Sequence, residues 1–276
     1  MMSTITDLIA SALNRLKAGS TQVEFIHKPH TRWPHPQPML TNPNLSPGPG
    51  SITTTVSDSN LPVTILDSSF NPPTLAHRAL ALLTVASSPT DARLLLLSVR
   101  NADKVPRPSD ALPVQRVEMM VLLAREVNAA VGLVDAPAFV HKAEILHAAL
   151  PAGAQLTFVQ GIDTLERFLA PRYYGDGSVT AMHAALRRFF APDGHNSRII
   201  CARRFVEHAE GEYAVFEAAR EWVEANQIHI VDIDNSLQTV SSSEVRAKVR
   251  AKDSSWRQMV PNGIAEYIEE HSLYIL

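Results

Sequence analysis

The fold is decided by one stretch, V-T-I-L-D-S-S-F-N-P-P-T-L-A-H, which occupies residues 63–77. Residues 63–66 form a short apolar run rich in β-branched side chains, a pattern that predicts a buried strand. Residues 68–73 contain two serines, an asparagine and two prolines, which favour a turn and cannot continue the strand. Thr74 is suited to begin a helix, because apolar residues recur after it at helical spacing.

A strand, a tight polar turn and a helix start in immediate succession make an anion site. Backbone N–H groups and the positive end of the helix dipole point into one small space. Thr74 and His77 are three residues apart, so both side chains lie on one face of the first turn, where each can donate to phosphate oxygens. A lone T-x-x-H pattern would more often be an ordinary capped connection with a half-exposed histidine.

The complete string S-F-N-P-P-T-x-x-H is much more specific, and it resembles the signature of the nucleotidyltransferase superfamily. The best match is to the eukaryotic nicotinamide mononucleotide adenylyltransferases, which carry G-S-F-N-P-x-T-x-x-H. Two residues depart from the pattern: Ser68 stands where the family usually has glycine, and Ala76 where the bacterial pattern has glycine. The side chain of Ser68 narrows the approach of a ligand to the backbone.

A second motif, V-S-S-S-E-V-R at residues 240–246, places three hydroxyls before a predicted helix. This is another N-terminal anion site, and Arg246 can grip a phosphate with two parallel hydrogen bonds. Standing alone, the motif would be a helix cap with a solvated basic face. It is similar to the family's I-S-S-T-x-x-R, which binds the β- and γ-phosphates of ATP. The resemblance implies this role for Ser242, Ser243 and Arg246. The serines can be matched to the family motif in either of two registers, one residue apart.

Three further positions match the family. G-I-D-T-L-E-R-F at residues 161–168 resembles G-x-D-x-L-E-x-F, which implies that Gly161 lets a nucleoside approach and that Asp163 accepts from ribose hydroxyls. The same carboxylate could cap the helix that follows. Lys104 matches a lysine that reaches the transferred phosphate. Arg116 resembles an arginine often found there, and its alternative is a solvated helix face.

The acceptor pocket departs most from the family, which places tryptophans around the nicotinamide ring. Neither residues 135–143 nor residues 170–176 contain tryptophan, so Phe139, Tyr173 and Tyr174 are the aromatic side chains left for stacking. The identity of the acceptor therefore stays open. The acceptor-binding set is expected to be Ser69, Phe70, Lys104, Tyr173 and Tyr174.

The resemblance implies transfer of AMP from ATP to nicotinamide mononucleotide, with NAD and pyrophosphate as products and Mg²⁺ bridging the phosphates. Two other functions stay open: an ATP-hydrolysing relative with a different or no acceptor, and an ATP-binding regulatory protein that binds partners through residues 1–60. The implied catalytic residues are His77, Thr74, Lys104 and Arg246. The implied phosphate- and ATP-binding residues are Ser68, Ser69, Phe70, His77, Gly161, Asp163, Ser242, Ser243 and Arg246.

In the remainder of the chain, short apolar runs alternate with segments whose apolar residues recur at helical spacing. This alternation predicts an α/β fold, a doubly wound parallel sheet of the Rossmann-like type with right-handed crossovers and an N-terminal helical extension. Residues 171–197 are expected to be a surface excursion. Further strands are expected at 93–99, 131–134, 156–160, 198–202 and 228–232, and further helices at 112–127, 142–150, 163–169, 180–190, 213–226, 243–251 and 264–271.

The N-terminal part is expected to hold an amphipathic helix over residues 4–18 and a short strand over 23–27. Three histidines, His27, His30 and His35, lie in or beside the Pro-rich stretch that follows, without the cysteines or carboxylates that would favour a metal site. We therefore expect no metal site there. The expected division is 1–27 for the helix and strand, 28–60 for the connector, and 61–276 for the nucleotidyltransferase domain.

Composition limits the class of protein. The 276 residues are 45% hydrophobic and 19% charged, which is typical of a soluble globular protein with a sizeable core. A net charge of -3 argues against general nucleic-acid binding, and a single cysteine excludes a disulfide framework. No apolar run reaches transmembrane length and no signal peptide is evident, so a cytoplasmic or nuclear location without membrane partners is expected. Oligomeric state is not readable from these features.

Overall fold

The computed structural model describes residues 4–37, 61–83, 92–100, 109–203 and 210–275. For residues 210–212 it describes the backbone alone. In these ranges the strands are β1 (Val23–His27), β2 (Leu61–Asp67), β3 (Ala92–Ser98), β4 (Ala129–Val134), β5 (Ala154–Gly161), β6 (Arg198–Arg203) and β7 (Ile228–Asp232). The α-helices are α1 (Ile5–Lys17), α2 (Leu75–Ala81), α3 (Pro113–Glu126), α4 (Phe139–Ala149), α5 (Ile162–Phe168), α6 (Val179–Phe190), α7 (Glu210–Glu224), α8 (Ser242–Arg250) and α9 (Asn262–Glu270). Short 3₁₀ turns are η1 (Pro171–Tyr173), η2 (Asn235–Leu237) and η3 (Ser254–Met259).

The strands form one sheet in the order β1-β4-β3-β2-β5-β6-β7. All neighbours from β4 to β7 pair in parallel, whereas β1 pairs with β4 in the antiparallel direction. The order reverses between β2 and β5, and ligands of open α/β sheets bind beyond the strands' carboxyl ends at such a point. The doubly wound fold is therefore confirmed, with β1 as an antiparallel edge strand that the all-parallel prediction did not contain.

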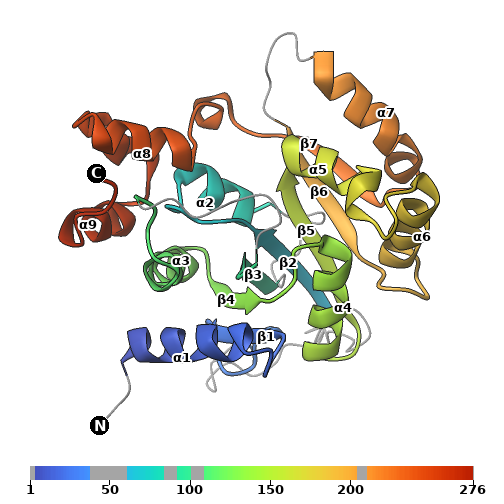
Figure 1. Cartoon of the computed structure of the whole chain (residues 1–276), viewed down its shortest axis with the longest axis horizontal. Helices are drawn as coiled ribbons and strands as arrows, with labels where there is room; N and C mark the ends of the chain where they lie inside the picture. Colours follow the sequence, from blue (N-terminus) through green and yellow to red (C-terminus); the bar gives the residue numbers. More distant parts are fainter. Residues whose placement is uncertain (1–3, 38–60, 84–91, 101–108, 204–209, 276) are drawn as a thin grey trace, which may run out of the picture.

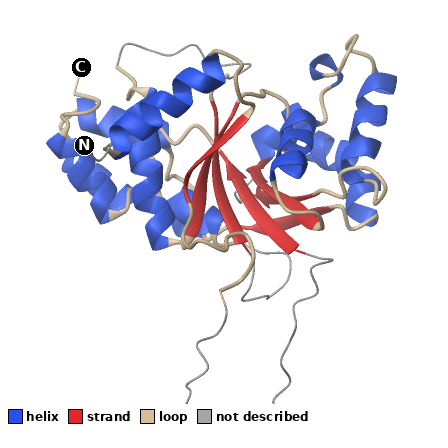
Figure 2. Ribbon diagram, turned by 90° about the horizontal axis from the view of Figure 1, so that it is seen from below, coloured by secondary structure: helices blue, strands red, loops and turns tan. Residues whose placement is uncertain are grey.

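Helices cover both faces of the sheet (Figures 1 and 2). Successive strand residues point to opposite faces, so Leu94 and Leu96 pack under the layer that contains α4 to α7, whereas Leu95 and Leu97 pack under α1 and α3. All four of these leucines are at most 2% exposed. Burial on both faces explains why these strands appear in the sequence as continuous apolar runs.

A third apolar cluster joins the C-terminal helices to the first half of the chain. Trp256 and Ile264, from η3 and α9, pack with Met119 of α3 and Ala76 of α2. Figure 1 shows α8 and α9 (red) beside α2 and α3. This packing brings the second predicted phosphate motif next to the first.

The N-terminal segment adds to the same sheet. Thr4 and Asp7 form a capping box at the start of α1, and Gly19, with φ of +70°, follows its end. The helix buries one stripe against α3 and β1. Ile5 and Leu8, whose helical spacing predicts a place on the same apolar stripe, are instead 40% and 54% exposed. Among the described residues, none of the helices is both long and apolar enough to cross a bilayer.

Two local predictions were wrong. Asp163 does not cap α5: Gly161 is the N-cap residue, no side chain bonds there, and Asp163 lies within the first turn. Residues 171–197 are not merely a surface excursion, because Leu186 and Phe189 of α6 are fully buried in the main core. The amphipathic periodicity of α6 supplies the apolar face that packs into this core.

Candidate functional site

The polar turn after β2 lies at the carboxyl edge of the sheet, beside the point where strand order reverses. The N–H of Ser68 donates to the carbonyl of Leu96 at 3.2 Å, which continues the β2–β3 ladder into the turn. Phe70 is completely buried although its φ is +44°. A bulky residue in this left-handed region is strained by about 1–2 kcal/mol, and burial of the ring holds it there.

His77 is held by the start of α2. The N–H of Thr74 donates to His77 Nδ1 at 3.1 Å, and Thr74 Oγ1 lies 2.8 Å from the same nitrogen. Thr74 Oγ1 also accepts from the His77 N–H at 3.4 Å, which completes a capping box. On the other side of the ring, Ser68 Oγ lies 2.9 Å from Nε2. The expected placement of Thr74 as the cap, with His77 one turn on, is confirmed.

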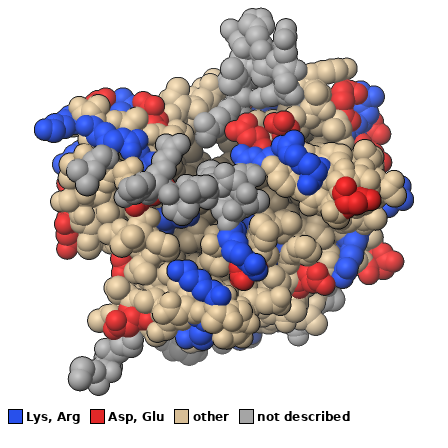
Figure 3. All heavy atoms as spheres, in the orientation of Figure 1, with Lys and Arg blue, Asp and Glu red and all other residues tan. Residues whose placement is uncertain are grey.

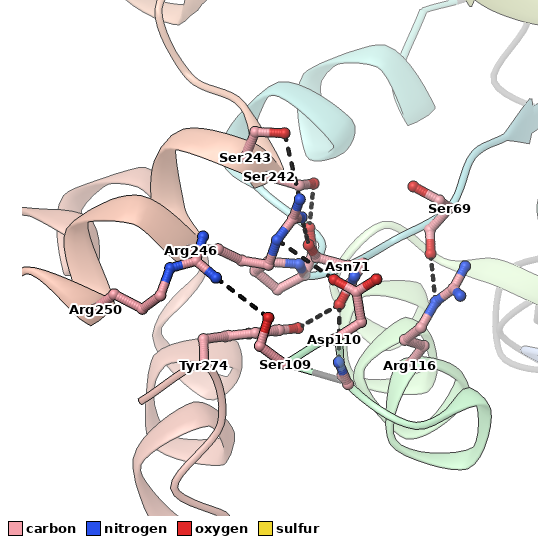
Figure 4. Close-up of polar contacts among 12 residues, drawn as sticks. Ser69, Asn71, Ser109, Asp110, Arg116, Ser242, Ser243, Arg246, Arg250 and Tyr274 are labelled. Carbon is pink, nitrogen blue, oxygen red and sulfur yellow. Dashed lines mark hydrogen bonds and ion pairs between the residues drawn. The ribbon is translucent and has the colours of Figure 1, made fainter. Parts of the chain in front are cut away.

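Two arginines bind carbonyl oxygens of the turn. Arg116 Nε of α3 donates to the Ser69 carbonyl at 2.7 Å, and Arg246 Nη1 of α8 donates to the Asn71 carbonyl. Figure 4 shows both guanidinium groups approaching the turn. These two carbonyl oxygens, which would repel an anion, are therefore neutralised by the arginines. Arg116 is partly buried rather than on a solvated helix face, and burial lowers the pKa of its guanidinium.

The start of α8 contacts the turn directly. Ser241 is the N-cap residue, and the Ser242 hydroxyl donates to the Pro72 carbonyl at 2.8 Å across 170 residues of sequence. Arg246 Nη2 donates to Ser243 Oγ at 3.4 Å, and Nε lies 3.7 Å from Asp110 Oδ1. The structure therefore brings the two predicted anion motifs together, with the two helix starts on either side of residues 69–73.

Asn71 connects the turn to the C-terminal segment. Its Oδ1 accepts from the Ala111 N–H at 3.3 Å and from the Tyr274 hydroxyl at 2.9 Å. Tyr274 is 4% exposed, and burial raises the pKa of its hydroxyl, so it stays a neutral donor. Sequence reasoning did not assign Tyr274 to the site. No local pattern relates residues 71 and 274, which are 203 positions apart.

The nucleoside residues predicted on β5 and α5 lie at the same edge. Leu66 of β2 pairs with Val159 of β5, so the register places Gly161 level with Ser68. A Cβ atom on Gly161 would meet no described atom within 4 Å, so space is open beside it. Asp163 is exposed in the first turn of α5.

The predicted acceptor residues are dispersed. Lys104 lies outside the described residues. Tyr174 belongs to the core: it is 8% exposed, and its hydroxyl donates to the Phe168 carbonyl at 2.5 Å. Tyr173, on η1, lies under the Arg172 guanidinium, with 4.8 Å between the guanidinium carbon and the ring centroid. Phe139 packs edge-to-face against neighbouring phenylalanines, with its centroid 5.6 Å from that of Phe158.

A buried ion pair lies directly before the turn. Lys142 Nζ of α4 donates to Asp67 Oδ2 at the end of β2, with the two side chains 5% and 9% exposed. The same ammonium lies 4.8 Å from the Phe139 ring centroid. No sequence motif pointed to this pair. It ties α4 to the residue from which the turn begins, and neither charge can be removed without leaving the other buried alone.

Charge elsewhere is mixed. On the face shown in Figure 3, basic and acidic side chains are interspersed over the surface. Within the ranges that the structure describes, no three His, Cys, Asp or Glu side chains cluster closely enough to hold a metal ion. The described part of the site thus offers donors for anions and no ready-made cation cage.

The chain is similar in sequence to a curated protein and in fold to a solved structure. No protein-family model matches the chain. Over 151 residues the chain is 34% identical to a Schizosaccharomyces pombe protein named "Putative nicotinamide mononucleotide adenylyltransferase", an alignment that covers 54% of this chain and 56% of that protein. The chain thus matches little more than half the length of this relative. A solved structure of Plasmodium falciparum nicotinic acid mononucleotide adenylyltransferase complexed with NaAD superposes with a TM-score of 0.52 at 14% identity, covering 77% of this chain and 97% of that one. This second likeness shows a shared fold.

Proposed function

We propose that the protein transfers AMP from ATP to a pyridine mononucleotide, with nicotinamide mononucleotide as the acceptor and NAD and pyrophosphate as products. The main support is the meeting of two helix starts, α2 and α8, on either side of residues 69–73, which makes a site for a polyphosphate. The name of the fission-yeast relative and the fold shared with the Plasmodium enzyme point to the same chemistry.

The reaction needs positioning and charge stabilisation rather than a covalent intermediate. An acceptor phosphate oxygen attacks the α-phosphorus of ATP in line, and the bond from that phosphorus to the bridging oxygen of pyrophosphate breaks. His77, with Nδ1 bound at the start of α2, directs its other ring nitrogen toward the turn and stabilises the α-phosphate as charge develops. Thr74 orients the ring, and Ser69 and Phe70 bind phosphate oxygens through the turn.

The leaving pyrophosphate is assigned to α8. Ser243 and the Nη2 end of Arg246 lie together at the helix start, and Ser242 fixes this helix against the turn. Because the described residues provide no cluster of metal ligands, Mg²⁺ is assigned to the substrate as MgATP, bound mainly by phosphates and water. Lys104 is proposed to neutralise the transferred phosphate.

The remaining roles follow the same edge of the sheet. Gly161, with open space beside it, is proposed to face the ATP nucleoside, and Asp163 to accept from its ribose. Tyr173 is proposed to bound the acceptor side. Tyr174, whose ring is buried in the core and whose hydroxyl donates to the Phe168 carbonyl, is proposed to support that side from behind rather than to stack on the acceptor.

A direct assay tests this proposal. The purified protein is incubated with MgATP and nicotinamide mononucleotide, with nicotinic acid mononucleotide, or with no acceptor, and products are separated by chromatography. NAD with an equal amount of pyrophosphate supports the proposal. Preference for the acid would reassign the acceptor. ADP or AMP formed at the same rate in all three incubations identifies an ATP hydrolase, and ATP binding without turnover identifies a regulatory protein.

Two arginines of α8 provide a matched pair for the phosphate role. Arg246→Ala is expected to raise the KM for ATP about tenfold or more, because it removes a charge-assisted donor. Arg250→Ala removes an arginine one turn further on, whose partner is Ser109 at 3.3 Å, and is expected to change the KM less than twofold. Equal effects would show that α8 does not bind ATP through Arg246.

A further inference from the structure

Ser68 and His77 are in direct contact, and the direction of their hydrogen bond decides what the pair can do. Ser68 Oγ lies 2.9 Å from His77 Nε2. If Nε2 accepts the hydroxyl proton, the pair is a nucleophile and its general base. If Nε2 carries a proton, the imidazole donates to the hydroxyl and cannot activate it.

The other ring nitrogen settles the direction. His77 Nδ1 receives the backbone N–H of Thr74 at 3.1 Å, and an N–H group can only donate. Nδ1 is therefore unprotonated, and the neutral ring carries its proton on Nε2. Because Nδ1 carries no proton, the Thr74 hydroxyl, 2.8 Å away, can only donate to it and is a second donor. A ring bound in this way donates to Ser68.

We propose that Ser68 is a catalytic residue that accepts a hydrogen bond from His77 and donates one to the α-phosphate. Nε2–H donates to Oγ, and the Ser68 hydroxyl hydrogen, polarised by that bond, donates to an oxygen of the α-phosphate in the transition state. No bond to Ser68 forms and no proton leaves its atom. This inference rests on the proposed function, because it specifies how His77 of the same site stabilises the α-phosphate.

The position of Ser68 fits this role. It is the first residue of the turn, directly after β2, and its own N–H is bound to Leu96 in the ladder, so its Cα cannot move away. It is partly exposed, whereas Thr74 behind the ring is fully buried. The chain of donors therefore runs from the protein interior, through the ring, to the accessible edge.

Steady-state kinetics of five variants, His77→Ala among them, test the proposal. Ser68→Ala is expected to lower kcat by about tenfold to a hundredfold with little change in the KM for ATP, since one transition-state donor is lost. Ser68→Thr keeps the hydroxyl and is expected to retain most of kcat. In the Ser68→Ala/His77→Ala double variant kcat should be no lower than in His77→Ala, because the two residues act as one unit. Ser178→Ala, which removes the N-cap serine of α6, is the stability control and should leave kcat unchanged.

Several results would overturn the proposal. Ser68→Ala with kcat within twofold of the wild type would remove Ser68 from catalysis, and a Ser68→Gly variant faster than the wild type would show that the hydroxyl obstructs His77. Nitrogen NMR that finds His77 Nε2 unprotonated would show that Ser68 donates to His77, which contradicts the proposal. Absence of dinucleotide product with the wild type would refute the proposed function instead. In that case the contact is tested by binding instead of by rate: the ³¹P resonance of the α-phosphate of bound ATP is compared in wild type and Ser68→Ala. An identical resonance would refute the contact between the Ser68 hydroxyl and the α-phosphate.

Discussion

Tyr274→Phe provides a demanding test of how the turn is held, because it deletes one oxygen that is distant in sequence from every phosphate motif. Its hydroxyl donates to Asn71 Oδ1 at 2.9 Å in a buried environment. Asn71 Oδ1 keeps its longer bond from Ala111, so the acceptor is not left entirely unpaired. We therefore expect a loss of about 1–2 kcal/mol in the free energy of unfolding. For a chain of this size this corresponds to a fall in Tm of roughly 2–4 °C.

The effect on turnover is expected to exceed the effect on folding. Asn71 lies between Phe70 and the prolines that lead into α2, so a shift of its amide moves the turn relative to His77. A displacement of about 1 Å in a site of this kind can cost up to a hundredfold, and we expect kcat/KM to fall about tenfold or more. Tyr267→Phe is the matched control, because its hydroxyl donates to Glu118 on α3, away from the turn.

Urea unfolding and initial rates of NAD formation measure the two quantities separately. Tyr267→Phe loses a bond to a carboxylate and is expected to be destabilised by about 1.5–3 kcal/mol, yet to keep its kcat/KM. Hydrogen exchange of a peptide spanning residues 68–74 should be faster in Tyr274→Phe only. The reasoning is refuted if the two variants lose activity equally, or if Tyr274→Phe loses activity only in proportion to its unfolded fraction.

Three further predictions concern stability. Lys142→Ala leaves its carboxylate partner at the end of β2 buried and unpaired, and urea unfolding should show a loss of about 3–5 kcal/mol. Gly194→Ala places a Cβ 2.2 Å from a backbone oxygen of α6 and should lower Tm, whereas Gly263→Ala, with open space around the Cβ, should not. Burial lowers the pKa of both His147 and His195 from 6.5, so the unfolded chain binds more protons as pH falls, and the free energy of unfolding measured in urea should decrease from pH 7 to pH 5. Substituting both histidines with glutamine should flatten that decrease.

The sequence alone predicted the elements whose signals are local. The apolar run before the turn, the threonine that caps α2 and the alternation of strands and helices depend on residues within a few positions of one another, and each was found where expected. The same locality explains the errors. Asp163 fits a cap by composition, but Gly161 already begins α5, and the outward side of α1 at Leu8 cannot be told from its inward side until a partner surface is known.

Only the tertiary structure decided which groups surround the turn. Ser242 reaches the Pro72 carbonyl across 170 residues, and Tyr274 reaches Asn71 across 203. Strand register and helix packing bring such groups together, and these depend on the sum of many weak apolar contacts rather than on any pattern near the residues themselves. The phosphate motifs could therefore be recognised one at a time in the sequence, but their meeting on either side of one turn is a property of the folded chain.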